Sequence, residues 1–536
     1  MFRQQVPSHE DICPQVPALT PSNSTLLQLL DDVYSSDDFK LYAYESLGGS
    51  VRIPTVTYDD LGSPEEDHRW EIHSQLHDYL VSRFPLSHEV LQRTKVARYA
   101  LVYKWQGTDD SLKPLVIAGH MDVVPVDPAT EDEWIYPPFS GHYDGEWIWG
   151  RGSSDDKPNV IGSLTAIEAL LEQAFQPTRT VLLAFGIDEE RGGITGASAI
   201  GQYLLETFGE NSLAMIVDEG GGYSDHAGTI FASPAVAEKG YVDVRVDVST
   251  PGGHSSRPPR HTGIGILANL VTGLEENPHD ARLVRERTYY QSLLCLVQYD
   301  RSTSPDLRAL VYASQGSDAK LHELEAKLSE TAPDYFAQAG TTQAVDLIGG
   351  GVKVNALPEA VWAIINHRIA DYSSVLEVQE HFAGIIKPVA EKYNMSVDAF
   401  GREIRLDRDT TWGHIQLSEA FGSGLEPAPV TPTTNSEAYE LLSGTILSTI
   451  RTNIRANTSR RTKDVIVSPA LSLGRHIDTR HYWRLTRHIF RYGHRGSSDS
   501  YNGAHTVNEA VRGEGLIEQI RFYTQLILNA NESDLD

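Results

Sequence analysis

The sequence has little cysteine, few basic residues relative to acidic ones, and no long apolar run. Only Cys13 and Cys295 occur among 536 residues. Two cysteines exclude a scaffold held by many disulfides and leave the pairing of these two undecided. No apolar stretch reaches the length of about 18 residues that would span a membrane. Lys and Arg number 45 against 73 Asp and Glu, a net charge of −28. Because phosphate groups bind basic surfaces, nucleic acid and anionic membranes are not expected as partners.

The rest of the composition is that of a globular protein. Hydrophobic residues make up 40% and charged residues 22% of the chain, which excludes a fibre or a disordered chain. The length exceeds what one small core can organise, so two or three domains are expected. The excess of carboxylates is compatible with cation binding.

Four tripeptides of the N-glycosylation type favour a secretory route. Each is weak alone, because such tripeptides arise by chance. No apolar signal segment follows Met1, so we expect any targeting segment to be missing from this sequence. The expected location is the vacuolar lumen or the extracellular space. The candidate acceptors are Asn23, Asn394, Asn457 and Asn531.

The first half of the chain alternates short apolar strands with helices. Strands are predicted at 114–122, 180–190 and 213–221 and a helix at 160–175. Fully apolar strands alternating with helices are typical of an α/β domain whose mainly parallel sheet is covered on both faces. Ligands of such sheets bind outside the carboxyl ends of the strands. At those ends the sequence places His120, Glu189, Glu190 and Asp218.

From about residue 240 the pattern changes to alternating polar and apolar residues, typical of a sheet with one solvated face. The segment up to about residue 401 reads as an α+β module inserted into the first domain. The polar stretch 312–336 is interpreted as extra decoration of this module. The predicted divisions are an N-terminal arm and first helix at 1–54, a first catalytic part at 55–235, the insertion at 236–402, and a second catalytic part at 403–536.

Two histidines and several carboxylates form a candidate metal site. His120 and Asp122 lie two residues apart on a predicted strand, so their side chains share a face, and Asp122 is suited to orient the imidazole of His120. Asp155 precedes a helix, and its two oxygens are suited to bridge two cations. With His505 far downstream, this group contains no thiolate and suits zinc or a similar divalent ion.

Each member of this group also has an ordinary structural interpretation. A single histidine is usually not a ligand, Asp155 alone reads as a helix cap, and Asp218 alone reads as a turn residue. Several of them at strand ends of one sheet are harder to explain in that way. Paired metals about 3.5–4 Å apart need ligands from several strands and a bridging carboxylate, and this set supplies both.

The ordered motifs resemble the co-catalytic zinc aminoacylase/carboxypeptidase superfamily. They are "GHMDVVPV", "GRGSSDDK", "DEERGG", "VDEGG", "GGHSSRP" and "TRHY…GAHTVNEA", which together cover nearly the whole chain. The "DDK" sequence and the early "CPQVPAL" favour the carboxypeptidase S (Gly-Xaa carboxypeptidase) branch and its N-fatty-acyl-amino-acid hydrolase relatives. The resemblance implies an α/β, mainly parallel-sheet di-zinc exopeptidase domain with an inserted α+β, ferredoxin-like lid domain.

The same resemblance implies roles for the site residues. One zinc ion would be held by His120, Asp155 and Asp218, and the other by Asp155, Glu190 and His505. Glu189 matches the general base, which takes a proton from the bridging water and returns it to the leaving amine. Asp188, the first acid of the triplet, has no assigned role and is interpreted as a solvated residue.

Further residues match the lid and the substrate pocket. His254 matches a lid histidine that stabilises the tetrahedral oxyanion, and Asn355 matches a lid residue that contacts substrate. Arg480 matches the arginine that clamps a free carboxylate, a task suited to a guanidinium fork. In many relatives the lid mediates dimerisation and its histidine serves the partner's site, so a homodimer through the lid is a possible assembly.

The expected function is a zinc-dependent metallocarboxypeptidase that cleaves the amide bond before the C-terminal residue of short peptides (Gly-Xaa type). An N-acyl-amino-acid amidohydrolase is the alternative with the same chemistry and a different substrate. A non-catalytic metal-binding or peptide-binding homologue is the third reading, but a binding protein has no need of Glu189.

Overall fold

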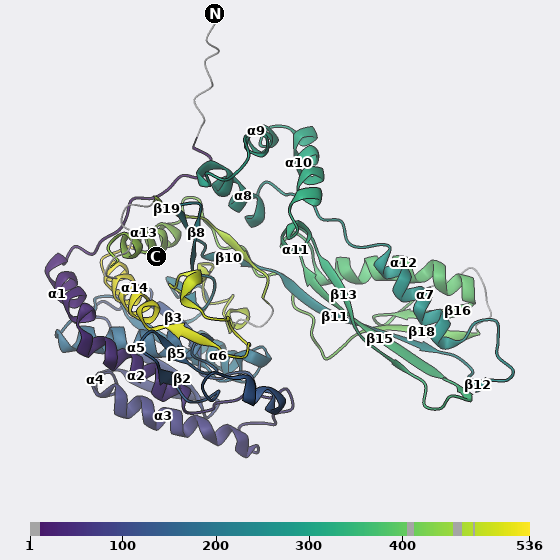
Figure 1. Ribbon diagram of the computed structural model, residues 1–536, viewed down its shortest axis with the longest axis horizontal. Coiled ribbons are helices and arrows are strands. Elements are labelled where there is room, and N and C mark those ends of the chain that lie inside the picture. The colour runs from purple at the N-terminus through teal and green to yellow at the C-terminus, as the bar shows by residue number, and fades with distance from the viewer. Residues whose placement is uncertain (1–10, 405–411, 454–463, 475–477, 536) are drawn as a thin grey trace, which may run out of the picture.

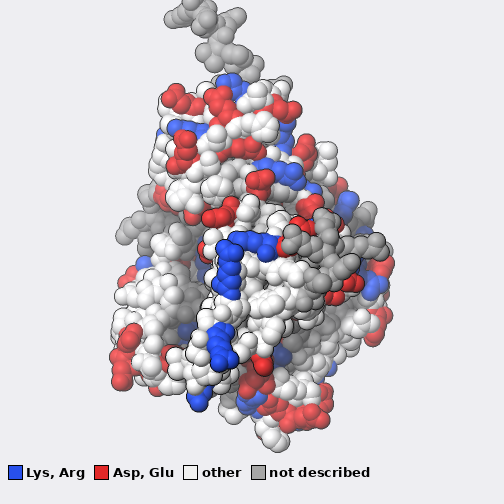
Figure 2. All heavy atoms as spheres, turned by 90° about the vertical axis from the view of Figure 1, so that its right-hand side faces the viewer, with Lys and Arg blue, Asp and Glu red and all other residues white. Residues whose placement is uncertain are grey.

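The computed structural model describes residues 11–404, 412–453, 464–474 and 478–535. A catalytic domain and an elongated lid lie side by side, and the lid extends far to one side of the catalytic domain (Figure 1). Figure 2 looks along the molecule onto the lid end. On that face acidic and basic side chains are interspersed, and the residues drawn in colour form no continuous basic surface.

The catalytic domain is organised by an eight-stranded sheet whose centre is parallel. β3 runs parallel to β6 and β7, and β7 runs parallel to β21, which confirms the predicted mainly parallel sheet. The first two strands form an antiparallel hairpin at one edge. In spatial order the strands are β1 Gln92–Val96, β2 Ala100–Trp105, β6 Val181–Gly186, β3 Leu115–His120, β7 Met215–Asp218, β21 Ile489–Arg491, β10 Ala235–Glu238 and β20 Ala470–Ser472.

The central strands are apolar because helices cover them. All residues of β3 and β6 are buried. α5 (Lys157–Glu172) packs on β3 with α14 (Gly513–Asn531) against it, and α6 (Gly196–Phe208) packs on β6. α5 lies between the sheet and α14, so it is buried almost all round, and its sequence is correspondingly apolar. Around them lie α3 Ile72–Arg83, α4 Pro85–Val90 and α13 Glu437–Arg451.

The lid has the strand and helix order expected of an α+β module. Two helices, α7 (Gly263–Glu275) and α12 (Val375–Tyr393), share one apolar core with its six-stranded sheet. Most of the sheet is antiparallel. In spatial order its strands are β13 Thr342–Gly350, β15 Ala360–Ile369, β11 Gly240–Ser249, β18 Gly413–Glu419, β16 Met395–Ala399 and β17 Arg402–Ile404.

The predicted domain boundaries differ from the structure by several residues. Residue 236 falls inside β10, a strand of the catalytic sheet. Residue 402 falls inside the lid, because β18 follows it and pairs with β11 along the lid sheet. Sequence pattern alone missed β18, because its partner lies more than 160 residues earlier, as the pair Val248 with Ile415 shows.

The stretch 312–336 belongs to a larger helical unit with a core of its own. This unit packs beside the catalytic domain, at the top of Figure 1, through α8 and β20. Residues 312–336 lie within the inserted segment of the chain, as predicted, but they form only part of this helical unit. The helices are α8 Thr288–Tyr299, α9 Pro305–Ser314, α10 Asp318–Thr331 and α11 Tyr335–Ala339.

The N-terminal region contains two helices where one was predicted. Ser36 separates α1 (Ser24–Ser35) from α2 (Asp37–Val51), because its hydroxyl accepts the backbone N–H of Phe39 and starts the second helix. The arm before them is tied down by a disulfide between Cys13 and Cys295 of α8, which settles the pairing that the sequence left undecided.

Three small sheets complete the fold. β12 Gly253–His254 pairs with β14 Ala356–Leu357 at the lid tip, and the others lie on the catalytic domain. No helix within the described ranges is long and apolar enough to cross a bilayer. The remaining strands are β4 His142–Tyr143, β5 Trp147–Trp149, β22 Ala510–Arg512, β8 Tyr223–His226, β9 Thr229–Ala232 and β19 Asp464–Val467.

Buried histidines make the stability of the fold pH-dependent. His367 on β15 is fully buried, and burial lowers its pKa to about 4. Below the ordinary value of about 6.5 the unfolded chain takes up a proton that the folded lid does not. We therefore expect unfolding free energy to fall with acidification and His367→Phe to reduce this fall by about 2 kcal/mol between about pH 7 and about pH 5.

Urea unfolding at the two pH values measures this difference. His68→Gln is the matched control, because the His68 side chain is 92% exposed. An equal pH dependence in wild type and His367→Phe would contradict the assignment.

Candidate metal centre

His120 lies at the carboxyl end of β3, and Asp122 contacts the Nδ1 side of its ring. Its Nδ1 lies 3.1 Å from the backbone oxygen of Asp122 and 3.3 Å from Asp122 Oδ1. The Asp122 carboxylate also accepts the backbone N–H groups of Glu189 at 3.1 Å and Glu190 at 3.3 Å. Asp122 lies just beyond the strand, and it ties His120 to the acidic turn on the neighbouring strand. Its geometry is that expected of a residue that orients His120.

Asp155 lies between the two histidines. Its Oδ1 is 3.0 Å from Nε2 of His120, and its Oδ2 is 3.2 Å from Nε2 of His505. Each carboxylate oxygen therefore faces a different imidazole, which is the arrangement that a carboxylate bridging two metals requires. Asp155 is not the cap of the following helix, whose N-cap residue is Asp156.

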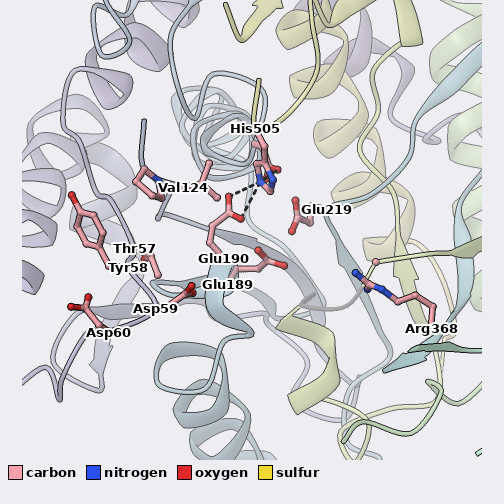
Figure 3. A pocket seen from close by; sticks show the side chains of 13 residues that line it. Thr57, Tyr58, Asp59, Asp60, Val124, Glu189, Glu190, Glu219, Arg368 and His505 are labelled. Atoms are coloured by element: carbon pink, nitrogen blue, oxygen red, sulfur yellow. Dashed lines mark hydrogen bonds and ion pairs between the residues drawn. The ribbon is translucent and has the colours of Figure 1, made fainter. Parts of the chain in front are cut away.

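Glu190 completes the second half of the centre. Its carboxylate oxygens lie 3.0 and 3.1 Å from Nε2 of His505 (Figure 3). Donor atoms of His120, Asp155 and Glu190 all lie within 4.8 Å of one another, the span of a metal-binding group. The structure thus brings together His120, Asp122, Asp155, Glu190 and His505 from four separate stretches of sequence.

Glu189 and Glu190 point in different directions because they lie in a short 3-10 turn, η3 (Glu189–Arg191). Glu190 turns toward His505, whereas Glu189 turns into the pocket (Figure 3). Oε2 of Glu189 lies 3.9 Å from Nε2 of His120, close to the centre but outside the Glu190–His505 pair. This division fits one ligand and one unligated acid.

Asp188, the first acid of the triplet, is buried, and its interpretation as a solvated residue is wrong. Its carboxylate accepts the backbone N–H groups of Thr195 at 2.8 Å and Gly196 at 2.7 Å at the start of α6. Burial raises its pKa to about 6. Between them the chain reverses through Gly192 and Gly193, both at positive φ, where glycine avoids the strain of a side chain.

Glu219, a residue without a predicted role, lies closer to His120 than the adjacent Asp218 does. Its Oε1 is 3.5 Å from Nε2 of His120. Oδ1 of Asp218 instead accepts the N–H of Glu219, and its Oδ2 is buried with no hydrogen-bond partner among the described residues. The two adjacent acids of "VDEGG" were the signal that two candidates exist here.

The electrostatics of this cluster favour cations. Burial, with repulsion from neighbouring carboxylates, raises the pKa of both Glu190 and Asp218 to about 7. The carboxylates hold the pKa of His505 up at about 10. Several buried acids thus converge at a centre to which the described part of the chain brings two imidazoles, His120 and His505. Divalent cations would supply the missing positive charge, and the unpartnered Oδ2 of Asp218 shows the same need.

A pocket of about 710 Å³ opens over these groups. One wall comes from the lid, where the guanidinium of Arg368 on β15 faces the pocket (Figure 3). Arg480, the predicted carboxylate clamp, is half-buried in the 3-10 turn η5 (Asp478–His481) and does not line this pocket. Arg368 could not be predicted from the sequence, because the segment "NHRI" gives no sign of facing another domain.

His254 and Asn355 lie at the opposite end of the lid. His254 is exposed on β12, and the backbone oxygen of Asn355 accepts the N–H of Ser255 beside it. β15 runs from this tip to Arg368, which lies near the other end of the strand, a distance of ~30 Å for an extended strand. The structure therefore does not bring His254 and Asn355 to the metal centre of the same chain (Figure 1).

Comparisons with known proteins agree with the fold. The pattern of Peptidase family M20/M25/M40 matches residues 116–529. Carboxypeptidase S of Saccharomyces cerevisiae is 37% identical over 98% of this chain and 90% of its own length. Mouse N-fatty-acyl-amino acid synthase/hydrolase PM20D1 is 30% identical over 92% of this chain and 89% of its own.

Among solved structures, the M20 family metallo-carboxypeptidase Sso-CP2 of Sulfolobus solfataricus superposes with a TM-score of 0.58 at 17% identity. The match covers 92% of this chain and 99% of the other. At that identity the likeness shows the fold alone, and it confirms a catalytic domain with an inserted lid.

The chain belongs to peptidase family M20/M25/M40. The expected class, a metallocarboxypeptidase, is confirmed by these relatives, and with it the dependence on a metal cofactor.

Proposed function

We propose that the protein uses two zinc ions to cleave the amide bond before the C-terminal residue of short peptides. The observation that carries this proposal is Asp155 placed between His120 and His505, one oxygen toward each. One ion would be held by His120, Asp155 and an acid of the pair Asp218 and Glu219, and the other by Asp155, Glu190 and His505. Imidazoles and carboxylates without thiolate suit zinc.

Glu189 carries the proton in this proposal. When bound, the metal ions act as Lewis acids and lower the pKa of the attacking water. The Glu189 carboxylate takes a proton from that water and delivers it to the nitrogen of the leaving residue. Asp122 contacts both the ring of His120 and the backbone N–H of Glu189. It therefore keeps the proposed base, Glu189, and the proposed ligand, His120, in fixed positions relative to each other.

Glu189→Gln tests this assignment together with the substrate class. We expect wild type to hydrolyse blocked glycyl dipeptides with a free C-terminus faster than long-chain N-acyl amino acids. The variant should keep both metals and lose turnover by about 10²–10⁴-fold, because the amide cannot take the proton. Metal analysis and a substrate panel measure the two effects.

Glu65→Gln, at an exposed glutamate, is the control and should behave as wild type. Loss of metal together with activity in Glu189→Gln would show a ligand in place of the base. Faster turnover of long-chain acyl substrates would favour the amidohydrolase.

The amidohydrolase remains the second candidate because of the similarity to PM20D1. The lining of the pocket favours the peptide substrate instead. Among the described lining residues, Val124 and Pro125 are the aliphatic ones, whereas most others are acidic or polar. A long acyl chain would therefore bury little apolar surface there.

Recognition of the free carboxylate is assigned to two arginines. The resemblance points to Arg480, and the geometry adds Arg368, which lines the pocket. A guanidinium fork can pair both carboxylate oxygens. For Arg368 this role rests on its place in the pocket wall, and for Arg480, which does not line the pocket, it rests on the resemblance.

Arg368→Ala and Arg480→Ala should raise KM for substrates with a free carboxylate by about 10–100-fold, the loss expected for an ionic hydrogen bond. Substrates with an amidated C-terminus should be indifferent to both changes. Steady-state kinetics on matched acid and amide substrates measures the difference. An equal loss on the amides would remove that arginine from the clamp.

We further propose a homodimer in which the lid tip of one copy serves the centre of the other. Nδ1 of His254 accepts the N–H of Ser256 at 3.1 Å, so the neutral ring carries its proton on Nε2. That N–H is suited to donate to the oxyanion of a partner's site, and Asn355 beside it is suited to contact substrate.

Mixing two inactive variants tests this arrangement. His254→Ala and Glu189→Gln should each lose activity. After subunit exchange at equal amounts, about half of the dimers are mixed and each has one intact site of two, so the mixture should regain up to about a quarter of wild-type activity. Subunit exchange followed by activity measurement provides the readout. Absence of rescue in a verified mixed dimer would mean that His254 acts within its own chain or not at all.

The disulfide supports an oxidising compartment, either the vacuolar lumen or the extracellular space, because cytosolic proteins rarely keep one. Of the proposed glycosylation sites, Asn23 is exposed and caps α1. Asn394 ends α12, and the side chain of Asn531 accepts the N–H of Thr178. Asn457 lies outside the described residues.

A further inference from the structure

A second pocket of about 320 Å³ lies on the catalytic domain, separate from the metal-site pocket. Its walls are the glycine turn 220–222, the loop 493–500 and Ser154. Five of its lining residues are serines and five are glycines, and its cation is Arg495. None of these residues lines the pocket over the metal centre.

Arg495 is half-buried in this pocket without an ionic partner. Its Nη1 makes one long hydrogen bond, 3.5 Å, to Oγ of Ser154, and no carboxylate of the described residues forms an ion pair with it. The acidic lining residue, Asp499, is engaged elsewhere. It accepts the N–H of Gly496 at 2.9 Å and lies 3.5 Å from Nε of Arg512. Arg495 is near enough to the buried Asp156 to favour the charged form of that carboxyl, but among the described residues it forms no ion pair. Partly buried charges are normally paired, so the guanidinium can take an anion from the pocket.

A hydroxyl in the same wall also lacks a partner. Oγ of Ser500 is buried and makes no hydrogen bond to any described residue. A buried hydroxyl without a partner costs free energy, and a ligand in the pocket would satisfy it. The guanidinium and the serine hydroxyls are all hydrogen-bond donors, which is the chemistry that recognises an oxyanion.

The shape of the pocket is fixed by close backbone packing. A Cβ on Gly222 would lie 1.9 Å from the backbone oxygen of Arg495, and a Cβ on Gly220 would lie 2.5 Å from the backbone of Arg491. Only glycine fits at these two positions. The turn and the loop that carries Arg495 are therefore held together as one rigid wall.

We propose that this pocket binds a small oxyanion, with Arg495 as the ionic partner and the hydroxyls of Ser154 and Ser500 as further donors. Phosphate, sulfate and a carboxylate share this chemistry. The pocket adjoins the metal centre through the chain, because Ser154 precedes Asp155 and Gly220 follows Glu219. Occupancy therefore braces the backbone of two acids of the centre and links activity to anion concentration.

Calorimetric titration of the metal-loaded protein with inorganic phosphate, sulfate and acetate, at constant ionic strength, tests the proposal. Wild type should bind at least one of these anions, and Arg495→Gln should weaken that binding by about tenfold or more. Arg495→Lys should keep part of the affinity, because it keeps the charge and loses the fork. Ser500→Ala should weaken binding by a smaller factor.

Arg93→Gln, at an exposed arginine on β1, is the matched control and should bind as wild type does. The relative affinities for phosphate, sulfate and acetate identify the anion's source. Anions bound at the metals would be insensitive to residue 495, so equal affinity and stoichiometry in wild type and Arg495→Gln would overturn the proposal. Absence of binding to wild type would overturn it as well. Neither result depends on the peptidase assignment.

Discussion

The contact of Asp155 with His120 on one side and His505 on the other is the constraint on which the rest of the structure depends. The three residues come from the end of β3, the loop before α5, and a loop close to the C-terminus. They meet only if the parallel sheet, α5 and α14 are all in place. The buried apolar strands and helices of the catalytic domain therefore serve to hold two oxygens of one carboxylate opposite two imidazoles.

Around that contact the chain concentrates acids, which is unfavourable unless cations bind. Glu190 and Asp218 have raised pKa values because they are buried beside other carboxylates. The turn 188–190 illustrates how neighbouring acids take separate positions. Asp188 holds the start of α6, Glu189 faces the pocket, and Glu190 contacts His505. Three consecutive acids thus supply a structural residue, a proposed base and a proposed ligand.

The lid combines a near end and a far end with different roles. Arg368 at the near end of β15 lines the metal-site pocket, whereas His254 lies beyond the far end of the same strand. A strand is stiff and extended, so the two residues cannot serve one centre in this arrangement. This geometry is the physical basis for proposing a second copy of the chain at the lid tip.

Local sequence determined much of this protein. Apolar strands followed by His120, Glu189 and Asp218 predicted a parallel sheet with polar residues along one edge. A strand that is buried on both faces is apolar along its whole length, so its polar residues come at its end. The tertiary structure alone decided which residues meet. Two of these contacts join distant segments: the pairing of β18 in the lid and the position of Arg368 at the pocket. Two others depend on how adjacent acids turn: the burial of Asp188 and the approach of Glu219 to His120. Periodicity records which face of an element is buried, but not what lies against that face, so these contacts could not be predicted from the sequence.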